Sequence, residues 1–315
     1  MFILGSGEYV PERVVDNLHF ARLTGRPVDW FTQRTGILER RRAGSDENVN
    51  SMAVAAVQSL IDSNGLSLDG VDLIIGVSYT PFDTIATIAH IVQRHFSIRG
   101  ARALYLSTAC SSFMDALDVA ESYIVAGRSK RALIVASEQN SAFSRDEDER
   151  SGHLWGDGAA AILLSAEAET SEFEVLDVQT RGLADLGEGP ESISLNPAGD
   201  GLVMRHGKQV FAHACHEMAA ATREILLRNG LDIEHVRLLV PHQANKRIID
   251  HVAKDLEIPP ERAAITISEL GNTGCAGVAI TLHRFGSTVA AGEHIVLVTF
   301  GGGYSSGAAL LRRSQ

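Results

Sequence analysis

Thr108-Ala109-Cys110-Ser111-Ser112 is the stretch from which the fold of this chain can be argued. The apolar run 103–106 precedes it and predicts a short buried strand. After it, an apolar stripe recurs at spacings of four, three and four, which is typical of an amphipathic helix: Phe113, Leu117, Ala120 and Ile124. Cys110 is therefore expected where a strand turns into the N-terminus of a helix.

That position predicts a reactive cysteine. The first N–H groups of a helix have no intrahelical partners, and the helix dipole places partial positive charge beside them. Both effects stabilise a thiolate, so we expect the pKa of Cys110 to lie one or more units below the usual value of about 8.5. The alternative is an inert side chain, because free cysteine is among the most buried residue types.

Composition narrows the class of protein. A chain of 315 residues with 45% hydrophobic content can bury the core of about two domains, or of one duplicated domain. No run approaches the ~20 apolar residues of a membrane span, and residues 1–7 read as a strand and glycine turn, so a cytoplasmic enzyme is expected. Three scattered cysteines fit a reducing compartment. The net charge of −11 argues against nucleic acid as a partner but leaves a local basic patch open.

Strands and helices alternate through the first half. A helix with an apolar stripe from Val49 to Leu60 is expected, with Ser45 or Asp46 as its N-cap and Gly65 at its end. The other expected elements are a strand at 71–77, a helix at about 84–96, and strands at 132–136 and 159–164.

The second half repeats this order. After a helix at about 210–227, the apolar run 236–240 follows the run 71–75 by 165 positions, and Gly274-Cys275-Ala276 follows Ala109-Cys110-Ser111 by the same offset. Residues 307–311 match 158–162 at an offset of 149, which places about 16 extra residues near 144–150. We interpret this as an internal duplication, with halves at 1–167 and 168–315; the alternative is chance similarity between two α/β units. Alternating elements predict a layered α/β body with mostly parallel strands. The polar connection 182–207 is long enough to suggest a wall or lid.

Three further sequence motifs contain candidate catalytic residues. His242, in Pro241-His242-Gln243-Ala244-Asn245, follows a predicted parallel strand at the edge where α/β sheets bind ligands. Asn272 lies in a glycine-flanked loop, and the triplet 301–303 has backbone N–H groups that can approach an oxyanion. The alternatives are a structural histidine, a turn residue and a tight turn.

Together these positions resemble the thiolase superfamily and, within it, the β-ketoacyl-(acyl carrier protein) synthase III family. The resemblance covers nearly the whole chain, from 9–13 and 30–37 to the glycine triplet, and its most specific motifs are 241–245 and Gly271-Asn272-Thr273. It implies a thiolase-like fold in which two duplicated αβ halves form a layered α-β-α-β-α body.

The resemblance also implies a Cys-His-Asn site. Cys110 would take an acyl group from acyl-CoA, and His242 with Asn272 would bind the carbonyl of malonyl-(acyl carrier protein). Loss of CO₂ leaves an enolate that two neutral donors can stabilise. The enolate would attack the acyl-cysteine, whose oxyanion is held by the N–H groups of Cys110 and Gly302, giving a 3-oxoacyl thioester for fatty acid biosynthesis. A homodimer without metal or redox cofactor is expected.

Binding residues follow from the same resemblance. Trp30 and Arg34 are expected near the adenine of coenzyme A, with Arg150 and Asn245 along the entrance tunnel. Docking of the carrier protein is expected on a basic helix that carries Lys246, Arg247 and Lys254. The alternatives are a core anchor for Trp30 and ordinary solvated charges for the helix.

Several positions depart from the family pattern. Ser112 stands where glycine is usual, and Gly274-Cys275-Ala276 replaces Ser/Ala-Ala, with Cys275 in a packing role. Ile85 lies near the position of a phenylalanine that closes the acyl pocket across the dimer, and Trp155 replaces another phenylalanine. These two residues are expected to shape the acyl pocket. Because both differ from the family pattern, the sequence does not predict the length of the acyl primer. Two alternatives remain. One is an enzyme of secondary metabolism that uses a longer or functionalised acyl group or malonyl-CoA, and the other is a catalytically silent ketosynthase partner.

No zinc site is expected, because the cluster His213, Cys215 and His216 lacks a second ligand pair.

Overall fold

Strands and helices alternate throughout the computed structural model, which describes residues 1–315. The strands are β1 (Phe2–Tyr9), β2 (Val14–Asp16), β3 (Glu39–Arg41), β4 (Leu73–Val77), β5 (Arg102–Leu106), β6 (Arg131–Gln139), β7 (Asp157–Ser165), β8 (Phe173–Gly182), β9 (Ile193–Asn196), β10 (Gly201–Met204), β11 (Val236–Pro241), β12 (His294–Gly301) and β13 (Ser305–Arg313). The α-helices are α1 (Asn17–Thr24), α2 (Val28–Thr35), α3 (Val49–Asn64), α4 (Ile88–His95), α5 (Ser112–Val125), α6 (Gly189–Ser192), α7 (Gly207–Arg228), α8 (Lys246–Asp255), α9 (Ile267–Leu270) and α10 (Ala276–Phe285).

Nine strands form one sheet in the order β11-β12-β13-β8-β1-β7-β6-β4-β5. In the first half of the chain β4 pairs parallel to β6, and β6 pairs antiparallel to β7. The second half repeats this pattern with β11, β12 and β13. The prediction of mostly parallel strands is wrong, because five of the eight neighbouring pairs in this sheet are antiparallel. The two parts of the sheet join where β1 meets β8, through the pairs Phe2 with Glu174 and Ile3 with Phe173.

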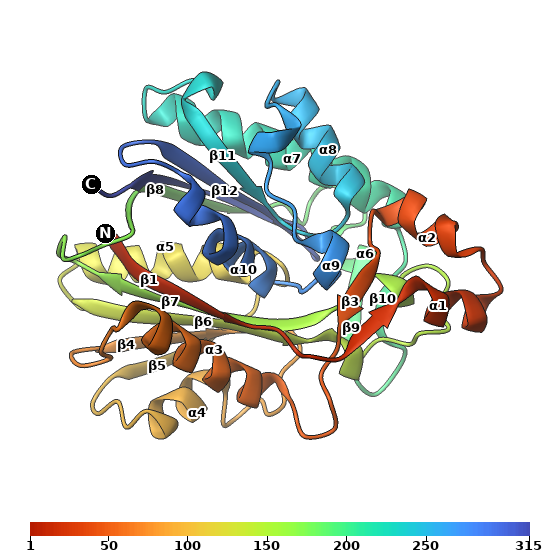
Figure 1. Cartoon of the computed structure of the whole chain (residues 1–315), viewed down its shortest axis with the longest axis horizontal. Helices are drawn as coiled ribbons and strands as arrows, with labels where there is room; N and C mark the ends of the chain where they lie inside the picture. The colour runs from red at the N-terminus through yellow and green to blue at the C-terminus, as the bar shows by residue number, and fades with distance from the viewer.

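The helices complete a layered body (Figure 1). Because side chains alternate along a strand, Ile75 packs inward against α5 and α10, whereas its neighbour Ile74 packs outward against α3 and α4. In the other half of the sheet Leu297 faces the central helices, and Val298 faces α7 and α8. The predicted α-β-α-β-α arrangement is therefore confirmed, with the two central helices buried between the two parts of the sheet (Figure 1).

The local predictions were accurate to a few residues, with three differences. Helix α3 is capped by Asn48 in a capping box with Ser51, and not by Ser45 or Asp46, because only a residue directly before the helix can reach its first N–H groups. Helix α4 begins at Ile88, so residues 84–87 form a loop. Strand β5 was predicted to be buried, but it is the edge strand of the sheet and is half-exposed. The expected boundary at 167/168 lies in the connection between β7 and β8.

The connection 182–207 contains the short elements α6, β9 and β10. Strands β9 and β10 pair with each other, and the N–H of Leu202 donates to the carbonyl of Phe143 at 2.8 Å. Five of its residues line the cavity described below, so this connection forms one wall of it: Ile193, Ser194, Leu195, Leu202 and Met204. None of the helices in the structure combines the length and apolar character that crossing a membrane requires.

Candidate active site

Cys110 lies in a sharp turn between β5 and α5. The residue before it, Ala109, has a φ of +51°, a conformation that non-glycine residues rarely adopt and that marks strain at functional turns. Gly301 packs against this turn: a Cβ on Gly301 would lie 2.9 Å from the amide nitrogen of Ser111 and 3.1 Å from that of Cys110. The glycine triplet can therefore approach the cysteine only because residue 301 has no side chain.

A cavity of about 230 Å³ brings the distant motifs together. Cys110, His242 and Asn272 all line it, together with the triplet 301–303. Much of the rest of its wall is apolar and comes from the connection 182–207, α7 and α8: Ile193, Leu195, Leu202, Met204, Val210, Ala214, Met218 and Ile248. Such a cavity suits an aliphatic chain that carries a reactive thioester at its inner end.

His242 follows directly after β11, and its backbone N–H donates to the carbonyl of Val298 at 2.8 Å. Its side chain is buried, and Nδ1 has no hydrogen-bond partner. Burial lowers the pKa of His242 to about 4, because no compensating negative charge stabilises the imidazolium. At neutral pH the side chain is an uncharged imidazole, which can donate one hydrogen bond into the cavity.

Asn272 is held by its own loop. The side-chain Oδ1 accepts the N–H of Gly274 at 3.0 Å, so the NH₂ group of the amide is left for the cavity. The backbone is fixed as well, since the N–H of Asn272 donates to Leu154 at 2.8 Å and its carbonyl accepts from Gly156 at 3.0 Å. Asn272 therefore presents donors, not acceptors, beside His242.

The prediction of a lowered pKa and a thiolate at Cys110 is wrong. Burial, and next the carboxylate of Glu138, raise the pKa of Cys110 to about 12. Hydrogen bonds from the N–H groups of Gly302 and of Cys110 itself act in the opposite direction but are outweighed. The argument from the helix N-terminus considered the local chain and could not include desolvation or a carboxylate from another strand. The cysteine therefore rests as a neutral thiol.

Glu138 on β6 is the main ionisable group that the sequence did not identify near Cys110. Its buried carboxylate accepts from Ser78 at 2.9 Å, from the hydroxyl and N–H of Thr80, and from the N–H of Tyr79. Cys275 lies 2.9 Å from the same carboxylate. Desolvation raises the pKa of Glu138 to about 7 despite these hydrogen bonds. Cys275 is thus buried beside a carboxylate and does not line the cavity.

A second cavity, of about 880 Å³, adjoins the first at Met204, which lines both. Four residues expected to bind the donor or the carrier line it: Arg34, Arg150, Asn245 and Arg247. Arg205, His206 and Lys208 complete a basic rim that the sequence analysis missed, although their run in the sequence is visibly basic. This rim is a local basic patch on an acidic chain, and we call it the basic mouth.

The remaining binding candidates lie around the basic mouth in different ways. The guanidinium of Arg34 stacks over the ring of Trp30 at 5.0 Å, and His153 packs against the same ring edge-to-face at 5.5 Å. Asn245 caps α8 by accepting the N–H of Arg247 at 2.9 Å, and its amide donates to the carbonyl of Arg34 at 3.3 Å.

Not all three basic residues of α8 face the mouth. Lys246 pairs with Asp250 at 2.7 Å, and neither Lys246 nor Lys254 lines the cavity. Arg247 is the member of the predicted set that does, with its guanidinium 5.7 Å from the ring of Phe211.

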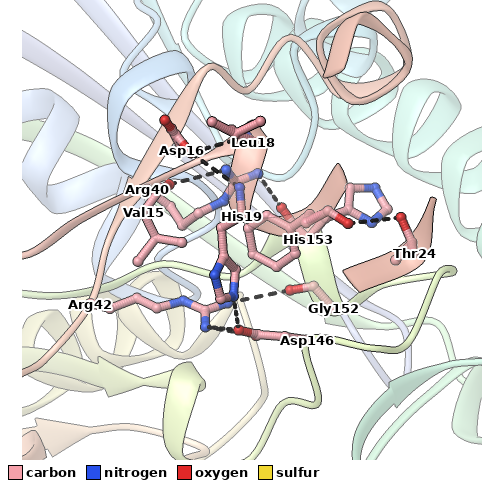
Figure 2. A network of polar contacts seen from close by, with 11 residues as sticks. Val15, Asp16, Leu18, His19, Thr24, Arg40, Arg42, Asp146, Gly152 and His153 are labelled. Atoms are coloured by element: carbon pink, nitrogen blue, oxygen red, sulfur yellow. Dashed lines mark hydrogen bonds and ion pairs between the residues drawn. The ribbon is translucent and has the colours of Figure 1, made fainter. Parts of the chain in front are cut away.

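A polar network ties the segment that carries Arg150 to α1 and β3 (Figure 2). Both oxygens of Asp146 accept from Arg42, at 2.7 and 2.8 Å, and His19 lies 2.7 Å from the same carboxylate. Arg40, fully buried, donates to the backbone carbonyls of Val15 at 3.2 Å and His153 at 2.6 Å (Figure 2). These bonds hold the segment that carries Arg150 against α1 and β3 on one side of the basic mouth.

The two residues expected to shape the acyl pocket lie apart. Trp155 is buried and lines the inner cavity. Ile85 is 85% exposed and does not line the cavity of its own chain. The histidines considered for zinc also separate: His213 packs on Tyr304 with ring centroids 5.2 Å apart, whereas His216 is exposed. No group of three metal-ligating side chains occurs.

Comparisons with known proteins agree with this geometry. Family models described as 3-oxoacyl-[acyl-carrier-protein] synthase III and its C-terminal part match residues 105–182 and 226–313. The chain is 35% identical to the β-ketoacyl-[acyl-carrier-protein] synthase III of Aquifex aeolicus, over 88% of this chain and 87% of that protein.

Solved structures show the same similarity. The crystal structure of 3-oxoacyl-[acyl-carrier-protein] synthase III from Aquifex aeolicus superposes with a TM-score of 0.92, 34% identity and 99% coverage of both chains. A priming β-ketosynthase of the R1128 polyketide pathway gives 0.89 at 29% identity, covering 99% of this chain and 96% of that one.

Proposed function

We infer the roles of individual residues from one premise: this chain belongs to the 3-oxoacyl-[acyl-carrier-protein] synthase III family and is a condensing acyltransferase. The observation that carries the inference is the cavity that Cys110, His242 and Asn272 share. The cavity offers a thiol, an uncharged imidazole and a carboxamide NH₂ at its inner end.

The first half-reaction loads the primer on Cys110. The sulfur attacks the carbonyl of an acyl-CoA, the bond from that carbonyl to the coenzyme A sulfur breaks, and the proton lost by Cys110 leaves on the coenzyme A thiol. Negative charge on the carbonyl oxygen in the tetrahedral intermediate is held by the N–H groups of Cys110 and Gly302. This role is supported by the effect of the same two N–H groups on the sulfur, where they favour negative charge and lower the pKa of Cys110.

The second half-reaction makes the nucleophile for condensation. Malonyl-(acyl carrier protein) loses CO₂, and its electrons remain as an enolate whose oxygen accepts from His242 and Asn272. Uncharged donors suit this step, because they stabilise the enolate without forming an ion pair that would hold it back from reaction. The low pKa of His242 and the orientation of Asn272 support the assignment.

Condensation joins the two halves. The enolate carbon attacks the acyl carbonyl on Cys110, a carbon–carbon bond forms, and the carbon–sulfur bond breaks to release the 3-oxoacyl thioester. The sulfur leaves as a thiolate and takes up one proton, which restores the resting thiol. None of these steps transfers electrons to or from a cofactor, so we propose that the enzyme needs neither metal nor redox cofactor.

Both thioesters are proposed to enter through the basic mouth. Trp30 and Arg34 offer a stacked surface for the adenine, and Arg150, Arg205 and Lys208 offer cations for its phosphates. We propose that the acidic carrier protein docks at Arg247, with Lys246 and Lys254, which belong to the same helix but do not line the mouth, contributing long-range attraction. Asn245 joins α8 to α2 at the mouth.

We propose that the enzyme is a homodimer and acts in the cytoplasm. β5 ends the sheet with unpaired backbone groups, which a second copy of the same strand can pair. Phe82 and Ile85, 68% and 85% exposed, lie just before α4, which packs on β5. An interface there would bury them, and Ile85 would then contact the partner's acyl pocket and not its own.

The experiment that tests the function is acyl loading. The protein is incubated with a panel of acyl-CoAs, and the mass added to the peptide bearing Cys110 is measured. We expect an acyl adduct with at least one primer, none in Cys110→Ala, and product after malonyl-(acyl carrier protein) is added. Absence of an adduct with every primer would contradict the proposal and favour the catalytically silent partner, against which the intact Cys110, His242 and Asn272 argue.

A role in secondary metabolism is the second candidate. The similarity to a polyketide priming ketosynthase favours it. The same panel separates the two: preference for a short primer and for malonyl-(acyl carrier protein) supports fatty acid biosynthesis, whereas a functionalised primer or direct use of malonyl-CoA supports the alternative.

A further inference from the structure

Tyr79 is a second polar side chain at the inner end of the cavity, and none of the steps above uses it. It follows β4 in the chain and lines the cavity together with Cys110. Its backbone N–H donates to the Glu138 carboxylate at 3.2 Å, and its hydroxyl donates to Oδ1 of Asn140 at 2.8 Å. Both ends of the residue are therefore anchored to the segment at the end of β6.

The acceptor of the Tyr79 hydroxyl is itself held in one orientation. The amide nitrogen of Asn140 donates to the carbonyls of Gly156 at 2.8 Å and Asn272 at 3.2 Å. An amide has two N–H bonds, so both are used and its oxygen must face Tyr79. Asn140 thus links the phenol to the loop that positions Asn272.

Space for the phenol exists because residue 274 is glycine. A Cβ on Gly274 would lie 2.5 Å from the hydroxyl oxygen of Tyr79 and 2.9 Å from its Cε1. A side chain there would push the ring out of its position. The phenol is therefore placed by three elements: the end of β4, the Asn140 turn and the Gly274 loop.

Tyr79 and Cys110 line the same cavity, and hydrogen bonding between the two side chains raises the pKa of Tyr79 and lowers that of Cys110. The other ionisable groups around the Cys110 sulfur are Glu138, Cys275 and His242. Glu138 repels a thiolate, and the Cys275 thiol donates to Glu138. A hydroxyl has one proton, so Tyr79 can donate either to Asn140 or to the sulfur, but not to both at once.

We propose that Tyr79 is a positioning residue for the nucleophile, whose hydroxyl turns from Asn140 to the Cys110 sulfur as negative charge develops there during acyl transfer. The inference rests on the proposed role of Cys110. The proton balance is that of the loading step: the thiol proton leaves with coenzyme A, while the Tyr79 proton stays on Tyr79 and only changes its acceptor.

Tyr79→Phe tests the proposal, with Tyr105→Phe as the matched control. Tyr105 is a nearby phenol that donates to the carbonyl of Ser78 at 2.6 Å and does not line the cavity. Two rates are measured from pH 7 to 10: alkylation of Cys110 by iodoacetamide and its acylation by acyl-CoA. We expect Tyr79→Phe to lower both about tenfold at each pH, which corresponds to a rise of about one unit in the pKa of the thiol.

Decarboxylation of the malonyl thioester should change less than twofold, because His242 and Asn272 carry that step. Unchanged alkylation and acylation in Tyr79→Phe, or an equal loss in Tyr105→Phe, would overturn the proposal. If the parent protein is alkylated but never acylated, the proposed function fails, while the alkylation rates still decide whether Tyr79 assists the sulfur.

A second variant tests the space at residue 274. Gly274→Ala should slow alkylation by displacing the phenol, and adding it to Tyr79→Phe should cause little further loss, because both changes remove the same hydrogen bond. Independent losses that multiply in the double variant would show that Gly274 does not act through Tyr79.

Discussion

Asn272 accepts the backbone N–H of Gly274 with its side-chain oxygen at 3.0 Å, and this bond decides which end of the amide faces the cavity of Cys110. An enolate oxygen needs donors, and the amide is turned so that it presents its NH₂ group. The position of Asn272 is therefore suited to the decarboxylation step and not to the loading step.

Asn272→Ala is expected to separate the two half-reactions. Removing one donor to a developing oxyanion typically costs about 10²–10³ in rate. Release of CO₂ from the malonyl thioester should fall by about that factor, while acylation of Cys110, followed by mass, should stay within about threefold of the parent rate. Asn272→Asp, which keeps the size but presents acceptors, should be at least as slow in CO₂ release. Loss of acylation in both variants would contradict this division of roles.

The pKa of His242 predicts a characteristic pH profile for decarboxylation. Burial lowers it from 6.5 to about 4, so the imidazole stays neutral and active above that value and is protonated only below it. The measurement uses a Cys110→Ala background, which removes the thiol. The rate of CO₂ release should not fall as the pH is lowered through 6.5, which is the midpoint of an ordinary histidine. An inflection near 7 that disappears in Glu138→Gln would belong to the buried carboxylate. A midpoint near 6.5 that persists in that variant would contradict the neutral, desolvated histidine.

The positions of the main site residues could be predicted from the sequence, because each residue lies next to a regular helix or strand. Cys110 was placed by the apolar period of the helix that begins at Ser112, and His242 by the strand that ends at Pro241. These patterns depend on neighbours within about a dozen residues, which a single sequence displays directly.

The parts that could not be predicted depend on pairing between distant segments. Glu138 looks like an ordinary strand residue until β4 and β6 pair and bring Ser78 and Thr80 to its carboxylate. The raised pKa of Cys110 has the same origin. Apolar periodicity also cannot distinguish an edge strand from a central one, which is why β5 was predicted to be buried.

Asp146→Asn is expected to destabilise the segment that lines the basic mouth without changing the catalytic residues. The carboxylate pairs with Arg42, which is 8% exposed, so its neutralisation leaves a nearly buried guanidinium without its counter-charge (Figure 2). We expect the free energy of unfolding to fall by about 2 kcal/mol, less than the ~3–5 kcal/mol of a fully buried pair, because the Asp146 side chain is 20% exposed. The KM for acyl-CoA should rise severalfold, because the segment 146–153 carries Arg150. The KM for a short acyl thioester without the nucleotide should not change. Arg94→Ala, on the exposed face of α4, is the control for loss of a surface charge. An equal rise of KM for both thioesters would show that the network does not act through the nucleotide end.

The buried carboxyl group of Glu138 is expected to make the free energy of unfolding depend on pH, and Glu138→Gln should remove this dependence. Because the pKa of Glu138 is raised from 4.5 to about 7 on folding, the folded protein holds this proton more tightly than the unfolded chain does. The carboxyl group therefore contributes a loss of stability as pH rises from about 4.5 to about 7, of up to about 3 kcal/mol. The amide keeps a hydrogen-bond acceptor for Ser78 and the N–H of Thr80 but cannot ionise. Urea unfolding at several pH values should show the variant gaining stability relative to the parent across this window. Glu191→Gln, an exposed carboxylate, controls for the change in net charge. Parallel stability curves for Glu138→Gln and the parent would mean that Glu138 ionises equally well in both states and does not repel charge on Cys110.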